Sequence, residues 1–354
     1  MDERIDRLVR ENIRKMTAYS SARSEFAGAG EIFLDANENS FGSPVETDYS
    51  RYPDPLQTEL RNRLARRHDV GPSNVFVGNG SDEAIDLLIR IFCRPSIDSI
   101  IVCPPTYGMY EVAAAINDVN VIRVPLREDF GLDGGSLEKV FTEATKLLFL
   151  CSPNNPTGNL MNRSTATDII RAFPGIVVID EAYMEFSGGE SLITEIESFN
   201  NLVVIRTFSK AFGLAGLRVG YAIAGEPIID YMLRVKPPYN VNRISQELAL
   251  AALDADSKVD RTIDAIISQR HMLADRIVTF PFVEKVFPSD ANFLLVKVID
   301  ATNLYRFLLE RRIVVRDRSR LEGCKGCLRI TVGTRDENEK LLEALTIYEK
   351  SFVY

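Results

Sequence analysis

The sequence predicts an α/β protein with two units: a large domain built on a mainly parallel sheet of about seven strands, and a smaller α+β domain. Three observations support this prediction. Between residues 75 and 224, short apolar runs alternate with helix-sized amphipathic segments, which is typical of parallel strands joined by helical crossovers. After residue 242 the pattern changes to long helical segments. The length of 354 residues is also sufficient for two domains.

The strands of the large sheet are expected where the chain is almost continuously apolar and rich in β-branched residues. Strands that helices cover on both faces have this composition. The runs lie at residues 75–77, 99–103, 119–124, 146–151, 175–180, 201–206 and 218–224.

The smaller domain is expected to begin with one long helix over residues 245–279. Strands at 293–298, 313–316 and 328–332 and helices at 304–312 and 337–352 should follow. The consecutive prolines of Lys236-Pro237-Pro238 break regular structure and mark the hinge. We therefore expect a large domain over 46–236, a small domain over 237–354, and an arm over 1–45 that packs beside the small domain.

Composition excludes several classes of function. The 42 basic and 50 acidic residues give a net charge of −8, which disfavours nucleic acid and therefore a DNA-binding regulator. The first ten residues lack the apolar region of a secretory signal, and no apolar run is long enough to span a membrane. An odd count of five cysteines favours reduced thiols in a cytoplasmic protein.

Metal chemistry is also not expected. The chain has only two histidines, and the single Cys-x-x-Cys pair, Cys324 and Cys327, has no second pair or nearby histidine to complete a tetrahedral site. We therefore predict no metal site, and the sequence does not assign a role to the two cysteines.

Two charged residues directly follow apolar runs. Lys210 follows the run at 201–206, where its amine can lose solvation, lower its pKa and form a Schiff base with a carbonyl. A solvated loop lysine is the alternative. Asp180 ends the run at 175–180, at the strand end where α/β proteins bind ligands. A carboxylate there can keep the ring nitrogen of a pyridine-type cofactor protonated, or it can cap the next segment.

Two loops add to this pattern. The segment 78–83, GNGSDE, lies between a predicted strand and a predicted helix, where glycines and free helix N–H groups can bind an anion. Ser81 or Asp82 as an ordinary helix cap is the alternative. The segment 152–158, SPNNPTG, is a turn that aims Asn155 at the same crevice.

These motifs resemble, in order and spacing, the fold-type I pyridoxal-phosphate aminotransferases. The resemblance is carried by SPNNPTG, by DEAY at 180–183 and by SKAFGLAGLR at 209–218, and it covers nearly the whole chain. The narrower resemblance is to the histidinol-phosphate aminotransferases. It is carried by LVRENIRKMTAYSSAR at 8–23, LDANENSFG at 34–42, RYPDP at 51–55 and CLRITVGT at 327–334. Ser40 departs from the proline that is common in that group.

The resemblance implies a cofactor, pyridoxal 5′-phosphate, and a role for each matching residue. Lys210 would bind the cofactor covalently and move the substrate's α-proton, Asp180 would pair with the ring nitrogen, and Asn155 and Tyr183 would bind the ring hydroxyl. Tyr107 would stack on the ring. The remaining cofactor-binding residues implied are Gly80, Ser81, Asp82, Thr207, Ser209 and Arg218, with Tyr52 supplied by the neighbouring subunit of a homodimer.

The resemblance also implies the substrate side of the site and the reaction. Arg329 would bind the acidic group of the substrate, with Arg316, Tyr19 and Asn37 assisting. The expected reaction is amino transfer between L-histidinol phosphate and 2-oxoglutarate in histidine biosynthesis. An aminotransferase for aromatic amino acids and a decarboxylase for a phosphorylated amino acid share the same motifs, so both remain alternatives.

Overall fold

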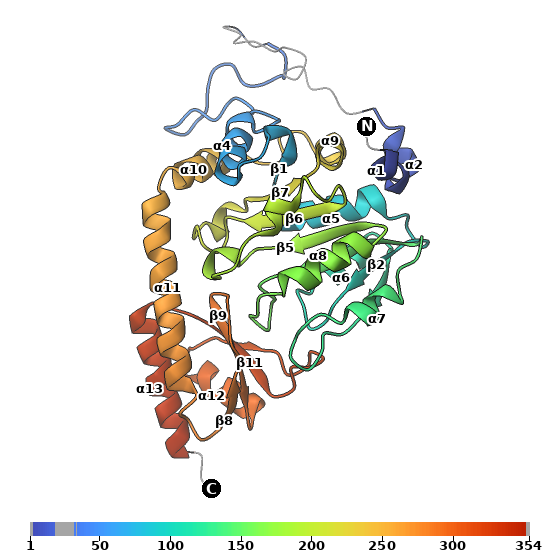
Figure 1. Cartoon of the computed structure of the whole chain (residues 1–354). Coiled ribbons are helices and arrows are strands. Elements are labelled where there is room, and N and C mark those ends of the chain that lie inside the picture. The colour runs from blue at the N-terminus through green and yellow to red at the C-terminus, as the bar shows by residue number, and fades with distance from the viewer. Residues whose placement is uncertain (1–2, 18–31, 33, 352–354) are drawn as a thin grey trace.

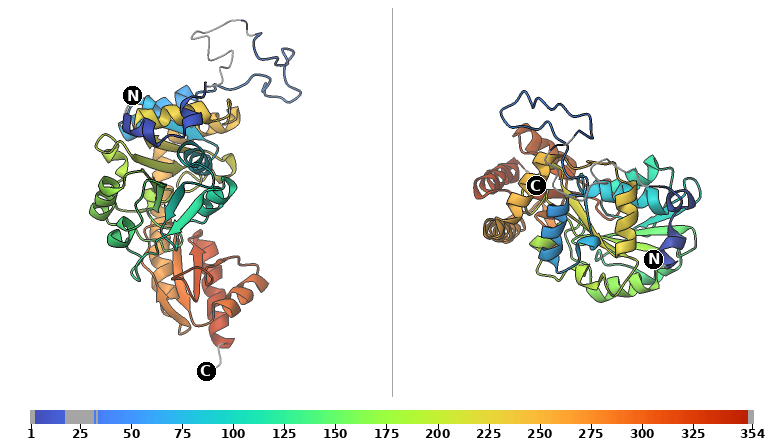
Figure 2. Two further views of the ribbon diagram at one scale, coloured as in Figure 1. Left: turned by 90° about the vertical axis from the view of Figure 1, so that its right-hand side faces the viewer. Right: turned by 90° about the horizontal axis from the view of Figure 1, so that it is seen from above.

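The structure is a computed structural model, and it describes residues 3–17, 32 and 34–351. Two sheets form two domains, the larger above the smaller in Figure 1, and the helix α11 (Asp256–Ile277) runs along one side of both. The views in Figure 2 show the elongated shape, with α13 (Arg335–Ser351) at the end opposite the first helix of the chain. No helix in the described part is both long and apolar enough to cross a membrane.

The large domain contains the predicted seven-stranded sheet. Its strand order is β1-β7-β6-β5-β4-β2-β3, and only β7 runs against the others. The mainly parallel α/β architecture is thereby confirmed. The strands are β1 (Val75–Gly78), β2 (Ser99–Val102), β3 (Asn120–Arg123), β4 (Thr145–Cys151), β5 (Ile176–Asp180), β6 (Leu202–Thr207) and β7 (Gly220–Ala224).

Helices cover both faces of this sheet, which explains why its strands are continuously apolar. Alternate residues of β4 enter different hydrophobic clusters: Leu148 packs towards α4, α8 and α10, whereas Phe149 packs towards α5, α6 and α9. The helices are α4 (Thr58–His68), α5 (Ser81–Phe92), α6 (Met109–Ile116), α7 (Gly134–Glu138), α8 (Arg163–Ala172), α9 (Glu226–Val235) and α10 (Arg243–Leu253). Short 3-10 turns lie at Pro72–Asn74, Met184–Phe186, Leu192–Glu195 and Ala215–Leu217.

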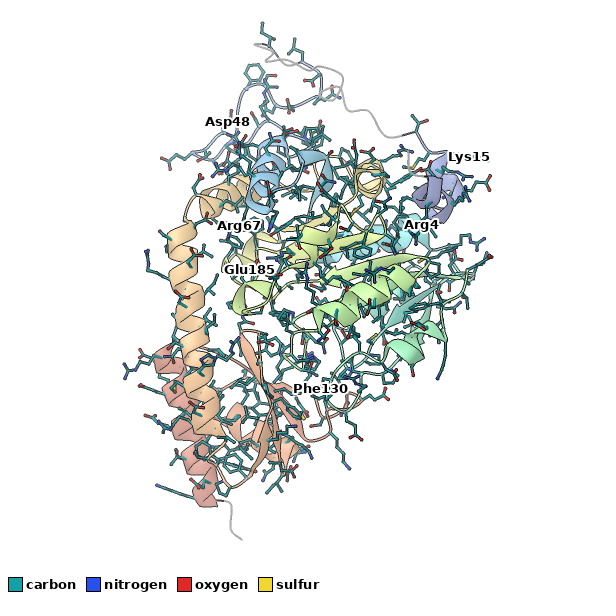
Figure 3. All side chains as sticks on the ribbon, in the orientation of Figure 1. Arg4, Lys15, Asp48, Arg67, Phe130 and Glu185 are labelled. Carbon is teal, nitrogen blue, oxygen red and sulfur yellow. The ribbon has the colours of Figure 1, made fainter. Side chains whose placement is uncertain are left out.

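The small domain is an antiparallel sheet with helices on one face. The strand order is β10-β11-β9-β8, and Leu294, Val296 and Val298 of β9 pack against the helices. The opposite face meets the large domain, where Leu295 belongs to the same hydrophobic cluster as Phe130. Figure 3 labels Phe130 at this junction. The elements not yet described are β8 (Val283–Val286), β9 (Phe293–Val298), α12 (Ala301–Glu310), β10 (Arg316–Asp317) and β11 (Cys327–Thr331).

Two local predictions for the small domain were wrong in detail, and one strand was missed. The single helix expected over 245–279 is two helices, α10 and α11, separated at Asp254 and Ala255. The two helices serve different partners, because α10 packs on α4 whereas α11 continues to the small domain. The strand expected over 313–316 is reduced to the two-residue β10, and β8 was not predicted.

The N-terminal helices pack on the large domain. In α1 (Glu3–Leu8) and α2 (Glu11–Arg14), the apolar residues Ile5 and Ile13 join the cluster that contains α5 and α9. The Tyr231 hydroxyl of α9 donates to the Asp6 carboxylate at 2.8 Å. The expectation that residues 1–45 pack beside the small domain is therefore wrong for residues 3–17, because their apolar side chains pack in the cluster that contains α5 and α9.

Candidate active site

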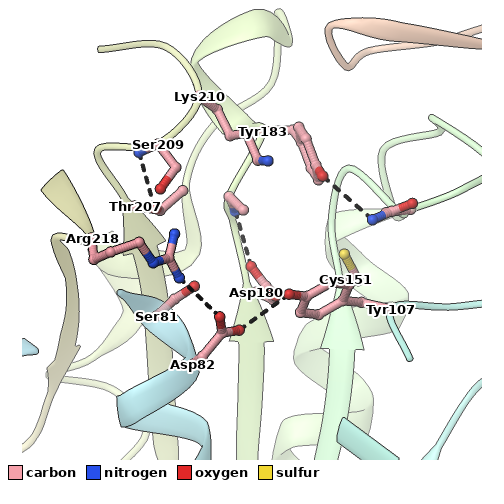
Figure 4. Close-up of a pocket in the computed structure, with 12 residues that line it drawn as sticks. Ser81, Asp82, Tyr107, Cys151, Asp180, Tyr183, Thr207, Ser209, Lys210 and Arg218 are labelled. Atoms are coloured by element: carbon pink, nitrogen blue, oxygen red, sulfur yellow. Dashed lines mark hydrogen bonds and ion pairs between the residues drawn. The ribbon is translucent and has the colours of Figure 1, made fainter. Parts of the chain in front are cut away.

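The carboxyl ends of the central strands open into a pocket of about 480 Å³. Figure 4 shows side chains from several strand ends converging there. Parallel strands bring their carboxyl ends to one edge of a sheet, so residues distant in sequence meet. The lining residues are Ser81, Asp82, Tyr107, Cys151, Asn155, Asp180, Ala182, Tyr183, Thr207, Ser209, Lys210 and Arg218.

Asp180 is a buried carboxylate at the end of β5. Its Oδ2 accepts a hydrogen bond from the Tyr110 hydroxyl at 2.7 Å, and its Oδ1 accepts one from the Ala182 N–H at 3.1 Å. Burial raises the pKa of Asp180 to about 6, although both hydrogen bonds act in the opposite direction. Asp180 forms no ion pair with any residue that the structure describes, which leaves its charge available to a ligand.

Lys210 lies beside Asp180, in the loop after β6. Its Nζ is 5.6 Å from the centre of the Tyr183 ring. Burial lowers the pKa of the Lys210 amine, and the positive charge of Arg329 lowers it further, whereas Asp180 raises it. A larger fraction of the amine is therefore neutral than in a solvated lysine, and neutral amines are nucleophiles and bases.

The start of α5 forms one wall of the pocket. Gly80, at φ +79°, precedes the helix, and no side chain caps the helix N-terminus. A Cβ at Gly220 of the neighbouring β7 would collide with the Ser81 backbone nitrogen, so glycine is required there for close packing. Free N–H groups at a helix start bind anions, and the Arg218 guanidinium is held beside them by Asp82 at 3.1 Å.

A chain of polar side chains leads from the pocket towards the small domain. The Tyr183 hydroxyl accepts from Asn155 Nδ2 at 3.3 Å, and Asn155 Oδ1 accepts from Arg329 Nη1 at 2.5 Å. Burial raises the pKa of the Tyr183 hydroxyl, which keeps it protonated. The hydrogen bond between Asn155 and Arg329 connects β11 of the small domain to the pocket.

Tyr107 borders the pocket on the α6 side. Its hydroxyl donates to Asp82 Oδ1 at 3.1 Å, and its ring meets the ring of Tyr110 edge to face, with centres 5.5 Å apart. Ser209 lies opposite, where its backbone N–H donates to the Thr207 hydroxyl at 3.0 Å.

Five of the predicted site residues that the structure describes do not line this pocket. Gly80 directly precedes the first residue of α5, and Arg329 hydrogen-bonds to Asn155 of the lining without lining the pocket itself. Tyr52 and Asn37 line a separate surface hollow of about 1050 Å³, where Tyr52 stacks on Tyr239 with ring centres 4.5 Å apart. Arg316 is exposed on β10, opposite Arg329. Tyr19 lies outside the described residues.

Cys151 and Ala182 line the pocket and Tyr110 hydrogen-bonds to Asp180, but none of the three was predicted as a site residue. Tyr110 is the second residue of α6 and lies three residues after the predicted Tyr107, which precedes the helix. Cys151 is the last residue of β4 and pairs with Asp180 in the register of the sheet. The rule that found Asp180 at a strand end also applies to Cys151.

Comparison with known proteins identifies relatives over almost the whole chain. Residues 38–345 match the family described as aminotransferase class I and II. The chain is 46% identical to a histidinol-phosphate aminotransferase from Cytophaga hutchinsonii, covering 97% of this chain and 99% of the relative. It is 48% identical to one from Parabacteroides distasonis, covering 96% and 97%.

Solved structures agree at the level of the fold. The crystal structure of histidinol-phosphate aminotransferase from Sinorhizobium meliloti in complex with pyridoxal-5′-phosphate has a TM-score of 0.79. It is 24% identical in sequence and covers 90% of each chain. The likeness therefore includes both domains described above.

Proposed function

Because the chain belongs to the aminotransferase class I and II family, we propose that it transfers an amino group between L-histidinol phosphate and 2-oxoglutarate. The products are 3-(imidazol-4-yl)-2-oxopropyl phosphate and L-glutamate, and in histidine biosynthesis the reaction runs towards histidinol phosphate. The observation that carries the proposal is the convergence of Lys210, Asp180 and the uncapped start of α5 on one pocket. The relatives named above carry the same activity in their names, which favours this reaction over that of an aromatic aminotransferase or a decarboxylase.

The cofactor is pyridoxal 5′-phosphate, and the residues of the pocket fit it. A buried Asp180 without an ion-pair partner among the described residues suits a cationic ring nitrogen. The uncapped α5 start and Arg218 suit a phosphate. When bound, the cofactor supplies an electrophilic aldehyde and a cationic ring that delocalises electrons.

Each remaining pocket residue has a proposed contact with the cofactor. Asn155 and Tyr183, already joined by a hydrogen bond, would bind the ring hydroxyl. Tyr107 would cover one face of the ring. The backbone and hydroxyl donors for the phosphate would come from Gly80, Ser81, Asp82, Thr207 and Ser209.

Lys210 is the proposed base. Its amine lies in the pocket, and its lowered pKa favours the neutral form that accepts a proton. We propose that Lys210 Nζ would accept the proton that leaves the α-carbon of the substrate and would return it to the C4′ carbon of the cofactor. Asp180 would remain ionised beside the ring, held by Tyr110 and the Ala182 N–H.

Arg329 is the proposed anchor for the substrate. Its Nη1 reaches Asn155, so the guanidinium lies next to the proposed ring position. A guanidinium binds a carboxylate or a phosphate in the same forked geometry. One residue can therefore serve glutamate in one half-reaction and the phosphorylated substrate in the other, with Arg316 and Asn37 assisting.

We further propose a homodimer that shares its active sites, in the cytoplasm. Tyr52 is half-exposed and lines the second hollow rather than the pocket, so its proposed contact with the cofactor phosphate requires a second copy. Apolar side chains near this hollow are exposed, among them Ile244 and Leu248 of α10. Sedimentation of the holoenzyme as a monomer would contradict this part of the proposal.

A half-reaction screen of the holoenzyme tests the function. L-histidinol phosphate, L-glutamate and L-phenylalanine are each mixed with the enzyme, and the visible absorbance of the cofactor is followed by stopped flow. We expect rapid conversion with the first two and slow conversion with phenylalanine. Conversion with phenylalanine but not with histidinol phosphate would favour an aromatic aminotransferase, and release of CO2 would favour a decarboxylase.

A further inference from the structure

Three arginines lie together on the face of the small sheet that meets the large domain. Arg316 of β10 is directly opposite Arg329 of β11. The Arg318 backbone N–H donates to the Cys327 carbonyl at 2.9 Å, which extends the pairing beyond β10. Residues two apart on a strand share a face, so Arg318 is on the same side as Arg316 and Arg329. The hydrogen bond from Arg329 to Asn155 shows that this side faces the active site.

These arginines are not neutralised by ion pairs with the described residues. In the part of the chain that the structure describes, no carboxylate forms an ion pair with any of the three. The Nε atoms of Arg318 and Arg329 and the hydroxyl of Ser319 are buried without a hydrogen-bond partner. A buried donor left unpaired is unfavourable, and the two guanidinium Nε atoms on this face indicate a ligand that supplies several acceptors.

Electrostatics point to the same conclusion. Burial lowers the pKa of the Arg318 guanidinium, and the charges of Arg329 and Arg316 lower it further. Tyr183, which lines the pocket, acts on Arg318 in the opposite direction, so Arg318 is within electrostatic range of the active site. Three guanidinium groups that repel one another are stabilised most by a dianion.

The charge of the substrate group decides between the two possible anions. A carboxylate carries a single charge, whereas a phosphate monoester carries about −1.5 to −2 near neutral pH and presents three acceptor oxygens. Two guanidinium groups suffice for a carboxylate. A third guanidinium group with an unpaired Nε atom would bind the additional charge and the third oxygen of a phosphate monoester.

We propose that Arg318 is a substrate-binding residue that, together with Arg316 and Arg329, selects a phosphomonoester over a carboxylate. The inference rests on the proposed function and extends it, because it assigns the phosphate group of the substrate to the β10–β11 face. Arg318 then determines specificity for the phosphorylated substrate and contributes little to the glutamate half-reaction, for which Arg329 is the main anchor.

Kinetics of the holoenzyme variants R318Q and R318K test this role, with R320Q as a matched control because Arg320 is exposed two residues further on. For R318Q we expect the KM for L-histidinol phosphate to rise by about ten- to a hundredfold, the loss of one charge-assisted contact. The kcat should change little. R318K should recover part of the loss, and R320Q should behave as wild type.

The glutamate half-reaction provides the internal comparison. R318Q should change the glutamate concentration at half-saturation by less than about threefold, since a carboxylate does not need the third guanidinium. An equal loss for glutamate and histidinol phosphate would mean that Arg318 only supports the structure of the site, and would overturn the proposal. No loss for either substrate would overturn it as well.

Inorganic phosphate separates this inference from the proposed function. We expect phosphate to compete with L-glutamate for the wild-type holoenzyme, and R318Q to raise its inhibition constant about tenfold, whereas R320Q leaves it unchanged. If the wild type does not convert histidinol phosphate, the proposed function fails, but the phosphate measurement still tests Arg318. Phosphate that inhibits R318Q and wild type equally, or neither, would overturn the inference.

Discussion

Replacing Asp180 with Asn is expected to stabilise the protein without its cofactor. The folded protein raises the pKa of this carboxyl from 3.8 to about 6, mainly through burial. One pKa unit corresponds to about 1.36 kcal/mol, so the ionised carboxylate costs about 3 kcal/mol in the folded state at neutral pH. The cofactor nitrogen, as a cation, would offset this cost in the holoenzyme.

The sign of the pH dependence follows from proton binding. Between about pH 4 and pH 6 the folded protein keeps the Asp180 proton that the unfolded chain has lost, so stability falls as pH rises through this range. Below pH 4 both states are protonated and the cost disappears. The side chain of Asn carries no charge, and its amide can accept from the Ala182 N–H and donate to the Tyr110 hydroxyl, so both existing contacts have a replacement.

The assay is urea denaturation of the apoenzyme, followed by far-ultraviolet circular dichroism because the chain has no tryptophan. At about pH 7.5, D180N should gain up to about 3 kcal/mol in the free energy of unfolding, and at about pH 4 the gain should shrink below about 1 kcal/mol. D180N should also retain the cofactor poorly. A variant that is less stable than wild type at about pH 7.5 would refute the assigned cost of the buried charge.

Three further substitutions test the pocket. Lys210→Ala should abolish the visible absorbance of the bound cofactor, since Lys210 is the only lysine among the described residues of the pocket lining; an unchanged spectrum would contradict its role. Arg329→Ala should weaken the binding of both glutamate and histidinol phosphate by about ten- to a hundredfold in half-reaction titrations. Weaker binding of one substrate alone would disprove the shared anchor. Tyr110→Phe removes a hydrogen bond that lowers the pKa of Asp180, so its cofactor affinity should fall most at the acidic end of the pH range; a pH-independent loss would indicate a packing defect.

Three of the residues that the sequence predicted at the site share one physical origin. Asn155, Asp180 and Lys210 follow apolar runs, and the structure brings all three to the lining of one pocket. Burial of both faces makes parallel strands apolar, and their common direction brings their carboxyl ends to one edge. A local pattern therefore specifies a long-range arrangement, although the roles of these residues remain proposals.

Contacts across elements escaped the same reasoning. The hydrogen bond from Tyr110 to Asp180 joins residues 70 positions apart, and the contact between Arg329 and Asn155 spans 174 positions and two domains. The packing of α1 on α9 also depends on a surface formed late in the chain. Hydrophobic periodicity reports which face of an element is buried, but it does not report which partner buries it.

The pocket and the side of the small sheet that carries Arg318 and Arg329 share one energetic feature. Each contains charged groups that the described residues leave unpaired. Asp180 is buried without an ion-pair partner among the described residues, and Arg318 and Arg329 have buried Nε atoms without hydrogen-bond partners. Each unpaired group destabilises the empty protein and strengthens binding of a ligand with the complementary charge. A cationic ring fits the first group and a dianionic substrate fits the second. The two unpaired sites lie on different domains, and Asn155 of the pocket lining accepts a hydrogen bond from Arg329 between them. Cofactor and phosphorylated substrate should therefore each favour the arrangement in which the small sheet faces the pocket.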